Sequence, residues 1–539
     1  MSEKASSLDR ERVDSDEKDV IGDRSQDTST INSADGDEAL RLVGLVKTTQ
    51  FSEEYNLKLR RKLDLLIPPL CAAVYFTQFL DKTSLNYASI MGFPIAPGTN
   101  YNLISAGFYF GFLVFEFPTV YIAQKLRIAK YLGANIILWG IVLMLHAIPT
   151  SFGPFFALRF LLGMCECCVA PILILIISMV GSLISAFDEI NLILSLSQFY
   201  KKNEQASRIS WFYVMNGCTQ IFGGFVAYGI SFYSGTRLAP YKIIYILLGG
   251  LAIVVGICVL IWLPDSPVHA RFLTKEERIA ALERVRNDQG GTENKTIKRE
   301  QIFEALLDIR TWLVVLSTIL TSIPNGALSN YSNIIIKGFG YTAKQTLILN
   351  TPAGAIAAIS TLFCGWYSDK KNERQTPIIM ALIPTIVGMA MLVGLNNSGN
   401  KGALLFGIYL IGTFGSSLST IYAYNASNTS GYTKKVTING LTLAFFAVGN
   451  IVGTQLFQPQ DAPGYIPGKV AIMLLLCIQL FVSGLLRWVN LRLNRKKRAQ
   501  LERLKQARGW TDEDVQRERE KHAFADLTDK QNVYFVYTA

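Results

Sequence analysis

Long apolar stretches separated by short polar turns constrain this chain more than any other feature. An α-helix needs about 20 apolar residues to cross roughly 30 Å of hydrocarbon. Because lipid offers no partner to backbone polar groups, such stretches must be helical. The sequence therefore predicts an all-α membrane protein with twelve transmembrane helices. They are expected at residues 63–91, 102–124, 130–149, 154–179, 207–232, 241–263, 309–337, 344–366, 377–395, 402–424, 436–457 and 469–491.

Charged residues gather outside these stretches. Only 17% of the 539 residues are charged, against about 25% in soluble domains. The polar, Ser-rich residues 1–57 lack the apolar core of a cleavable signal peptide and are typical of a disordered tail. The predicted domains are this tail, a six-helix bundle at 58–264, a central loop at 265–308, a second six-helix bundle at 309–491 and a C-terminal tail at 492–539.

Basic residues indicate the orientation of the chain. They cluster before the first span, at residues 125–130 and 370–374, and after the twelfth span. Because cytoplasmic loops carry an excess of Lys and Arg, both termini and the central loop are predicted to be cytoplasmic. These clusters explain the net charge of +11, so no nucleic-acid partner is expected. Asn396 would lie in an outside loop, within a triplet that can accept a glycan.

The segment from Val180 to Gln198 disturbs this pattern, and two interpretations of it stay open. It is too apolar for a loop and, with Asp188 and Glu189, too polar for a span, which suits an amphipathic helix at the inner membrane surface. Alternatively, a retained in-frame intron encodes its 19 residues, or 57 nucleotides at three per residue. Valine codons begin with GT, one glutamine codon is CAG, and removing the segment joins the end of a span to a basic loop.

Four of the ionisable residues inside predicted spans stand out: Asp81 and Lys82 in the first, and Arg159 and Glu166 in the fourth. Glu116 lies near the end of the second span. Each costs roughly 2.5–3.5 kcal/mol near the bilayer centre, so such residues usually face a cavity or a partner. Arg159 and Glu166 are seven residues apart and share one helix face, about 10 Å apart along the axis. We expect them to serve substrate binding and proton transfer. The alternative is that the four residues only neutralise one another as ion pairs between helices.

The second six spans are poorer in buried charge and offer amides and phenols. Asn325, Asn330 and Tyr331 lie in the seventh span, and Asn425 follows the tenth. These side chains can hydrogen-bond a polar substrate, and we predict them as substrate-binding residues together with Lys82 and Arg159. Taken singly, a hydrogen bond between helices is the simpler explanation for each.

Enzymatic chemistry is not expected. Cys165, Cys167 and Cys168 cluster in an apolar stretch with no nearby His, as expected for small packing residues and not for metal ligands. The sequence shows no nucleophile–base set and no phosphate-binding loop. We therefore expect no catalytic residues, no cofactor and no metal.

Motifs spread over nearly the whole chain match a known family. The chain resembles the allantoate permease family of fungal anion:cation symporters, within the major facilitator superfamily. The first-half motifs are FLDKTSLNYASIMGF, GFYFGFLVFEFPT and LRFLLGMCE, followed by LPDSPVHARFLTKEERIAALERVR after the sixth span. The second half adds EALLDIRTWL, IPNGALSNYSNIIIKGFGY, GWYSDKKNER, SNTSGYTKK, GNIVGTQLFQPQDAPGY and the terminal DLTDKQNVYFVY.

This resemblance implies the major facilitator fold, in which two six-helix bundles alternate access to a central site. It also implies proton-coupled uptake of a small organic anion, such as a carboxylate vitamin or an allantoate-like ureido acid, by a monomer in the plasma membrane. Asp81 and Glu166 would carry the proton, while Lys82 and Arg159 would attract the anion. Lys82 stands where many relatives have Arg, and Lys offers a point charge instead of a planar fork.

The resemblance further implies a gating loop between the eighth and ninth spans, formed by Gly365, Asp369 and Arg374. Two other functions stay open beside symport. One is an uncoupled facilitator or exporter with the same fold, and the other is a nutrient sensor that binds without transporting. Sensors of that kind often carry long cytoplasmic extensions, whereas the tails here are modest. The sequence does not name the substrate.

Overall fold

The computed structural model describes residues 52–169, 214–233, 235, 237–264, 270, 272–286, 298–371, 373–511, 513–515 and 528–538. Every regular element among these residues is a helix. Segment 180–198 lies outside the described residues, so both interpretations of it stand as predictions.

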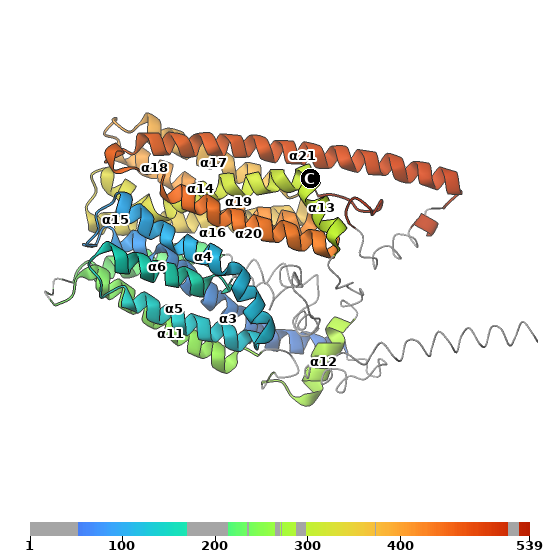
Figure 1. Ribbon diagram of the computed structural model, residues 1–539, viewed down its shortest axis with the longest axis horizontal. Helices are drawn as coiled ribbons and strands as arrows, with labels where there is room; N and C mark the ends of the chain where they lie inside the picture. The colour runs from blue at the N-terminus through green and yellow to red at the C-terminus, as the bar shows by residue number, and fades with distance from the viewer. Residues whose placement is uncertain are drawn as a thin grey trace, which may run out of the picture.

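The described helices form two bundles that lie side by side (Figure 1). The first contains α3 (Glu53–Ala88), α4 (Thr99–Lys125), α5 (Ile128–Leu145), α6 (Phe152–Glu166), α10 (Met215–Ile230) and α11 (Pro240–Trp262). The second contains α14 (Ile309–Gly338), α15 (Ala343–Leu349), α16 (Thr351–Lys371), α17 (Gln375–Gly394), α18 (Lys401–Ile411), α19 (Gly415–Asn428), α20 (Tyr432–Thr454) and α21 (Ile466–Arg508). Two short 3₁₀ helices, at Gly412–Phe414 and Pro459–Asp461, interrupt the second bundle.

These helices occupy the positions of the twelve predicted spans. In the described part of the chain, eight helical segments are long and apolar enough to cross a membrane. They include α15 with α16 and α18 with α19, each pair filling one predicted span, and α4, α5, α6 and α10 complete the twelve. The prediction of an all-α protein with twelve spans is confirmed.

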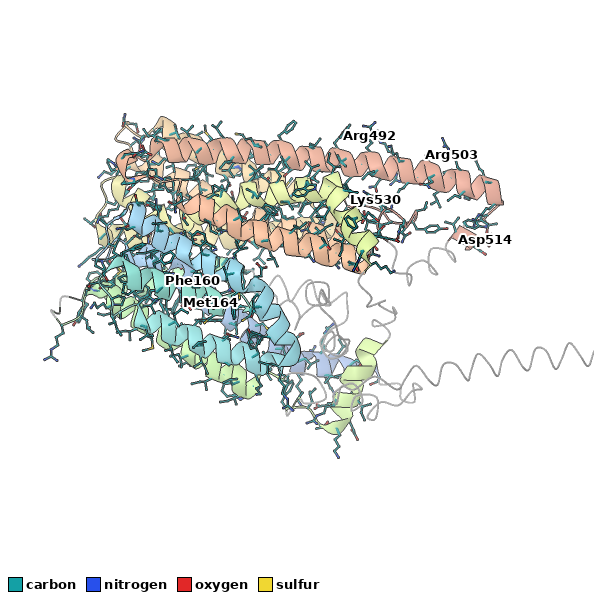
Figure 2. All side chains as sticks on the ribbon, in the orientation of Figure 1. Phe160, Met164, Arg492, Arg503, Asp514 and Lys530 are labelled. Carbon is teal, nitrogen blue, oxygen red and sulfur yellow. The ribbon has the colours of Figure 1, made fainter. Side chains whose placement is uncertain are left out.

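The polar segments contain more structure than the sequence suggested. α3 begins at Glu53, where the Ser52 hydroxyl caps it by accepting a hydrogen bond from the Tyr55 backbone N–H at 3.3 Å. The central loop holds α12 (Lys275–Arg286) and α13 (Arg299–Leu307). α21 runs on to Arg508 and ends at Gly509, whose φ of 62° suits a helix C-terminus. Figure 2 shows Arg492 and Arg503 on this extension, beyond the other helices.

Glycines let helices within each bundle approach closely. A Cβ atom at Gly111 of α4 would clash with the carbonyl oxygen of Phe160 in α6, and one at Gly453 of α20 would clash with that of Ile323 in α14. Small residues at such crossings allow backbone-to-backbone packing in membranes. Each bundle is therefore held by close helix contacts, which position the polar side chains between the bundles.

Hydrogen bonds join the two bundles near the end that carries α15, opposite α12 and α13 (Figure 1). Asn86 of α3 donates through Nδ2 to the Ser332 hydroxyl at 2.7 Å, and its Oδ1 accepts from the backbone N–H of Asn333 at 3.1 Å. The Tyr101 hydroxyl donates to the Asn330 carbonyl at 2.9 Å, and Asn102 donates to the Phe457 carbonyl at 2.9 Å. These bonds close the bundles against each other at the α15 end.

Candidate functional site

A cavity of about 340 Å³ lies between the two bundles. Most of the area of its wall is apolar, and polar side chains from both bundles are set among the apolar and aromatic ones, as in many small-molecule sites. The first bundle contributes the polar side chains of Gln78, Lys82, Asn86, Tyr109, Glu166, Asn216 and Gln220, and the second contributes Asn325, Ser329, Ser332, Asn350, Tyr422 and Asn439.

Lys82 brings the positive charge of the first bundle to this cavity. Its Nζ lies 5.6 Å from the ring centre of Phe79, 5.4 Å from that of Tyr109 and 5.7 Å from that of Phe446. Such distances allow cation–π attraction. Because Phe446 belongs to α20, this aromatic cage joins the two bundles around one ammonium group.

Glu166, the last residue of α6, also lines the cavity. Its side chain is fully buried, and neither carboxylate oxygen has a hydrogen-bond partner among the described residues. Only its backbone carbonyl is engaged, accepting from Gln78 at 3.4 Å. A buried carboxylate without partners is costly to keep charged, so it is well placed to take up a proton or to meet a ligand.

Asp81 precedes Lys82 on α3 but does not line the cavity. It is fully buried beside the indole of Trp139, and its carboxylate oxygens have no hydrogen-bond partner in the described part of the chain. The side chains of Glu166 and Arg159 lie close enough to act on it electrostatically. Asp81 thus lies in a second, buried layer, behind the cavity wall to which Glu166 belongs.

Arg159 lies in this layer and is absent from the cavity lining. It is 2% exposed, and its Nη2 donates to the Ser84 hydroxyl at 3.3 Å and to the Tyr245 hydroxyl at 3.5 Å. Among the described residues, no ion pair within 4.0 Å joins Arg159 or Lys82 to either carboxylate. In this conformation the four charges act on one another without forming close ion pairs.

The predicted residues of the second bundle separate into two groups. Asn325 lines the cavity and donates to Oδ1 of Asn450 at 2.8 Å. Asn330 instead donates to the Gly326 carbonyl at 2.8 Å, and the Tyr331 hydroxyl donates to the Asn102 side chain across the bundles.

Asn425 is also outside the lining, where its Nδ2 donates to the Thr442 hydroxyl at 3.1 Å. Together with Asn330 and Tyr331 it holds helices or bundles together in this conformation. The simpler explanation offered for them, a hydrogen bond within or between helices, describes their contacts.

The predicted gating residues lie at the turn from α16 to α17. Gly365 and Asp369 belong to α16, and Arg374 precedes α17 and donates to the Ser368 hydroxyl at 2.6 Å. The neighbouring Glu373 pairs with Arg487 of α21 at 2.9 Å. The hydrogen bond from Thr376, aided by the charge of Arg487, holds the pKa of Glu373 below its ordinary range. This turn is thus tied to α21.

Several amides on the cavity were not among the predicted site residues. Asn216 has a buried Oδ1 with no hydrogen-bond partner among the described residues, and Gln220 donates to Oδ1 of Asn350 at 3.3 Å. Their signal in the sequence is an amide inside an apolar span. That signal does not distinguish a cavity-lining amide from one that bonds a neighbouring helix.

Comparisons with known proteins agree with this architecture. A sequence model of the Major Facilitator Superfamily matches residues 71–454. Allantoate permease of Saccharomyces cerevisiae is 32% identical over 518 residues, covering 93% of this chain and 90% of that protein. An uncharacterized transporter of Schizosaccharomyces pombe is 36% identical over 493 residues, covering 91% of each. The inward-facing, unoccupied crystal structure of a bacterial homolog of the lysosomal transporter Spinster has a TM-score of 0.57 at 14% identity, covering 79% of this chain and 97% of that one. That last likeness concerns the fold alone.

Proposed function

Since the chain belongs to the Major Facilitator Superfamily and, within it, to the allantoate permease family, it is a multi-pass membrane transporter, and we propose that it takes up a small organic anion together with a proton. The anion is a carboxylate vitamin, an allantoate-like ureido acid or a similar small acid. The two bundles rock about the central cavity and expose it first to one side of the membrane and then to the other.

One observation carries this proposal: Lys82 and Glu166 line the same cavity, on different helices, without forming an ion pair. An ammonium group attracts the carboxylate of a substrate into an otherwise apolar site. The amides of the opposite wall, with Asn325 among them, can hydrogen-bond the substrate's remaining polar groups. This combination favours an amphipathic anion over a sugar or a cation.

Proton coupling in this proposal uses the competition between Glu166 and the substrate for Lys82. When Glu166 is protonated, Lys82 has no rival carboxylate, and an anion binds. When Glu166 releases its proton, its negative charge competes with the anion and favours release. Asp81 is the second proton carrier and exchanges the proton with Glu166. Arg159 lies outside the cavity and attracts both carboxylates electrostatically. It stabilises their arrangement and does not bind substrate.

The orientation follows from the basic clusters. Both termini, α12 and α13 face the cytoplasm, and the α15 end faces outward. In this proposal the protein is a monomer in the plasma membrane. Because hydrogen bonds join the bundles at that end, this conformation is closed to the outside. Gly365, Asp369 and Arg374 then form a cytoplasmic turn that moves with the second bundle.

Uptake of labelled carboxylates at pH 5 and pH 7 tests the proposal. The panel is allantoate, nicotinate, pantothenate, biotin, small peptides and sulfonates, in cells that express the chain, Asp81→Asn or Glu166→Gln. Uptake should be faster at pH 5 and should collapse in both variants. Glu116→Gln is the matched control, because Glu116 is a 5% exposed carboxyl in α4 that does not line the cavity.

Three outcomes would contradict symport. Uptake that survives dissipation of the proton gradient would indicate an uncoupled facilitator. Substrate that leaves loaded cells faster than it enters would indicate an exporter. Binding of a panel member without any uptake would indicate a nutrient sensor.

A further inference from the structure

The last described residues of the chain, 528–538, return to the second bundle and pack against it at the α13 end. Figure 2 shows Lys530 near α13 and alongside α21. The segment contacts side chains of α13, the first turns of α14 and α20, the end of α19 and the extension of α21. The segment therefore connects five helices of the chain.

A buried charge cluster lies at the centre of this contact. Asp529, which is fully buried, forms ion pairs with Arg310 and, at 2.8 Å, with Lys434. Asp308 pairs with the same two cations, at 3.1 Å and 3.0 Å. All four side chains are at most 7% exposed. The Tyr537 hydroxyl completes the cluster by donating to Oδ2 of Asp529 at 2.9 Å.

Without this segment the second bundle would lose a fully buried carboxylate that pairs with two buried cations. Among the described residues, Arg310 would then pair with Asp308, and Lys434 with Asp308 and the 19% exposed Glu304. An uncompensated buried charge is strongly unfavourable. Asp529 therefore gives these two cations a second deeply buried carboxylate, from a distant part of the chain.

Amide side chains of the bundle bind the backbone of the segment as a peptide site would. Asn494 accepts from the Tyr537 backbone N–H at 2.9 Å and donates to its carbonyl at 2.8 Å. Asn428 accepts from the Thr538 N–H at 2.7 Å, and Asn490 donates to the Thr538 carbonyl at 2.9 Å. The guanidinium carbon of Arg310 lies 4.2 Å from the ring centre of Tyr537. The bundle thus contacts the backbone, the buried carboxylate and the aromatic ring of the segment, with Arg310 contacting both of the last two.

The same contact secures α13. Oε1 of Gln301 accepts from the backbone N–H groups of Thr433 and Lys434, at 3.0 Å and 3.3 Å, at the start of α20. Glu304 of α13 binds Lys434 through one oxygen at 2.9 Å, and its other oxygen accepts from the Thr528 hydroxyl at 2.9 Å. α13 is the last helix of the connection between the two bundles. Through the hydrogen bond from Thr528 to Glu304, the segment helps to hold that connection against the second bundle.

We propose that residues 528–538 are a built-in peptide ligand of the second bundle, whose docking locks α13, α14, α20 and α21 into one unit. The carboxylate of Asp529 and the phenol of Tyr537 are its specificity-determining groups. A bundle from which the segment has left is a receptor for the same peptide supplied separately.

Cleavage of the folded full-length chain tests this proposal without relying on a variant that has to fold. A site-specific protease sequence is inserted between residues 516 and 527, and the purified protein is cut in detergent. The C-terminal peptide should stay bound through gel filtration and should exchange with a labelled synthetic peptide of residues 526–539. An Asp529→Asn peptide should bind at least about tenfold more weakly, because it lacks the charge that Arg310 and Lys434 share.

A Lys530→Gln peptide is the matched control. The Lys530 side chain is 46% exposed and lies 3.5 Å from Asp308, so its loss should change affinity by less than about threefold, as for other exposed pairs. Equal affinity of the Asp529→Asn and unchanged peptides would overturn the proposed recognition. Hydrogen exchange tests the locking: washing out the peptide should speed exchange in α13 and the first turn of α20 at least about tenfold. Unchanged exchange there would overturn the locking.

Discussion

Buried charges occur in both bundles, but they are organised in opposite ways. In the first bundle, no ion pair within 4.0 Å links Asp81, Lys82, Arg159 and Glu166 in the described part of the chain, and both carboxylates lack hydrogen-bond partners. In the second bundle, Asp308, Arg310, Lys434 and Asp529 alternate in sign and form close ion pairs. The unpaired group adjoins the cavity, and the paired group lies at the α13 end, outside the cavity lining.

This difference indicates that ion pairing, and not burial alone, distinguishes a functional role of a buried charge from a structural one. A closed set of ion pairs has no capacity left for a proton or a ligand, and breaking it leaves an uncompensated charge. Unpaired carboxylates beside a cavity keep that capacity, and perturbed groups of this kind cluster at functional sites. We therefore propose a functional role for the first group and a structural role for the second.

The largest expected effect comes from breaking the paired group. Lys434→Met leaves Asp308 and Asp529 sharing one buried cation, Arg310, which should lower the free energy of unfolding by about 3–5 kcal/mol, as for other broken buried pairs. Thermal or denaturant unfolding in detergent measures this loss. The double variant Lys434→Met, Asp529→Asn should regain part of it, because Asp308 and Arg310 then remain as a neutral pair. If Lys434→Met is as stable as the unchanged chain, the paired charges have no structural role.

The unpaired group should respond in the opposite sense. Asp81→Asn removes a buried charge that has no ion pair, so stability should stay unchanged or rise slightly, while uptake at pH 5 falls at least about tenfold, or about 1.4 kcal/mol. Parallel unfolding and uptake measurements on the same preparation test both halves. A loss of several kcal/mol in stability would show that Asp81 has a structural role, and the two bundles would then not differ in this respect.

Acid should weaken the paired group by a smaller amount. Burial alone would raise the pKa of Asp308, but the charges of Arg310 and Lys434 outweigh it and hold that pKa below its ordinary value of 3.8. A lowered pKa stabilises the folded chain above the ordinary value, and this contribution is lost as the pH falls through the folded-state pKa. Melting temperature should therefore hold between pH 7 and about pH 4 and fall below that range.

Asp308→Asn is the control for this pH dependence, because it removes the titrating carboxyl. Its melting temperature should be lower at pH 7 and should fall less steeply below about pH 4 than that of the unchanged chain. An identical slope in both proteins would show that other acids determine the acid sensitivity.

The smallest effect is expected at an exposed ion pair. Lys62 of α3 lies 2.7 Å from Glu277 of α12, with side chains 41% and 20% exposed. Water screens such pairs, so Lys62→Ala should change the free energy of unfolding by at most about 1 kcal/mol. Denaturant unfolding of Lys62→Ala and of Lys434→Met, under the same conditions, compares the two losses in free energy of unfolding directly. A loss as large as that of Lys434→Met would show that burial does not set the difference between ion pairs in this protein.

The sequence alone determined the number and approximate positions of the spans. Their length and apolarity suffice, because lipid requires each crossing segment to satisfy its own backbone hydrogen bonds. The sequence also singled out Lys82, Glu166 and Asn325, all of which line the cavity, since a polar group inside a span has to be compensated by a cavity or a partner.

Only the tertiary structure decided which predicted polar residues reach the cavity. It left Arg159 behind the wall and engaged Asn330, Tyr331 and Asn425 in contacts between or within helices. It also joined Asp308 and Arg310 to Lys434 and Asp529, in a cluster that no local pattern indicates. The physical reason is that the length and composition of a span are local properties. The rotation of each helix, and the partners that a distant segment meets, depend on how all the helices pack.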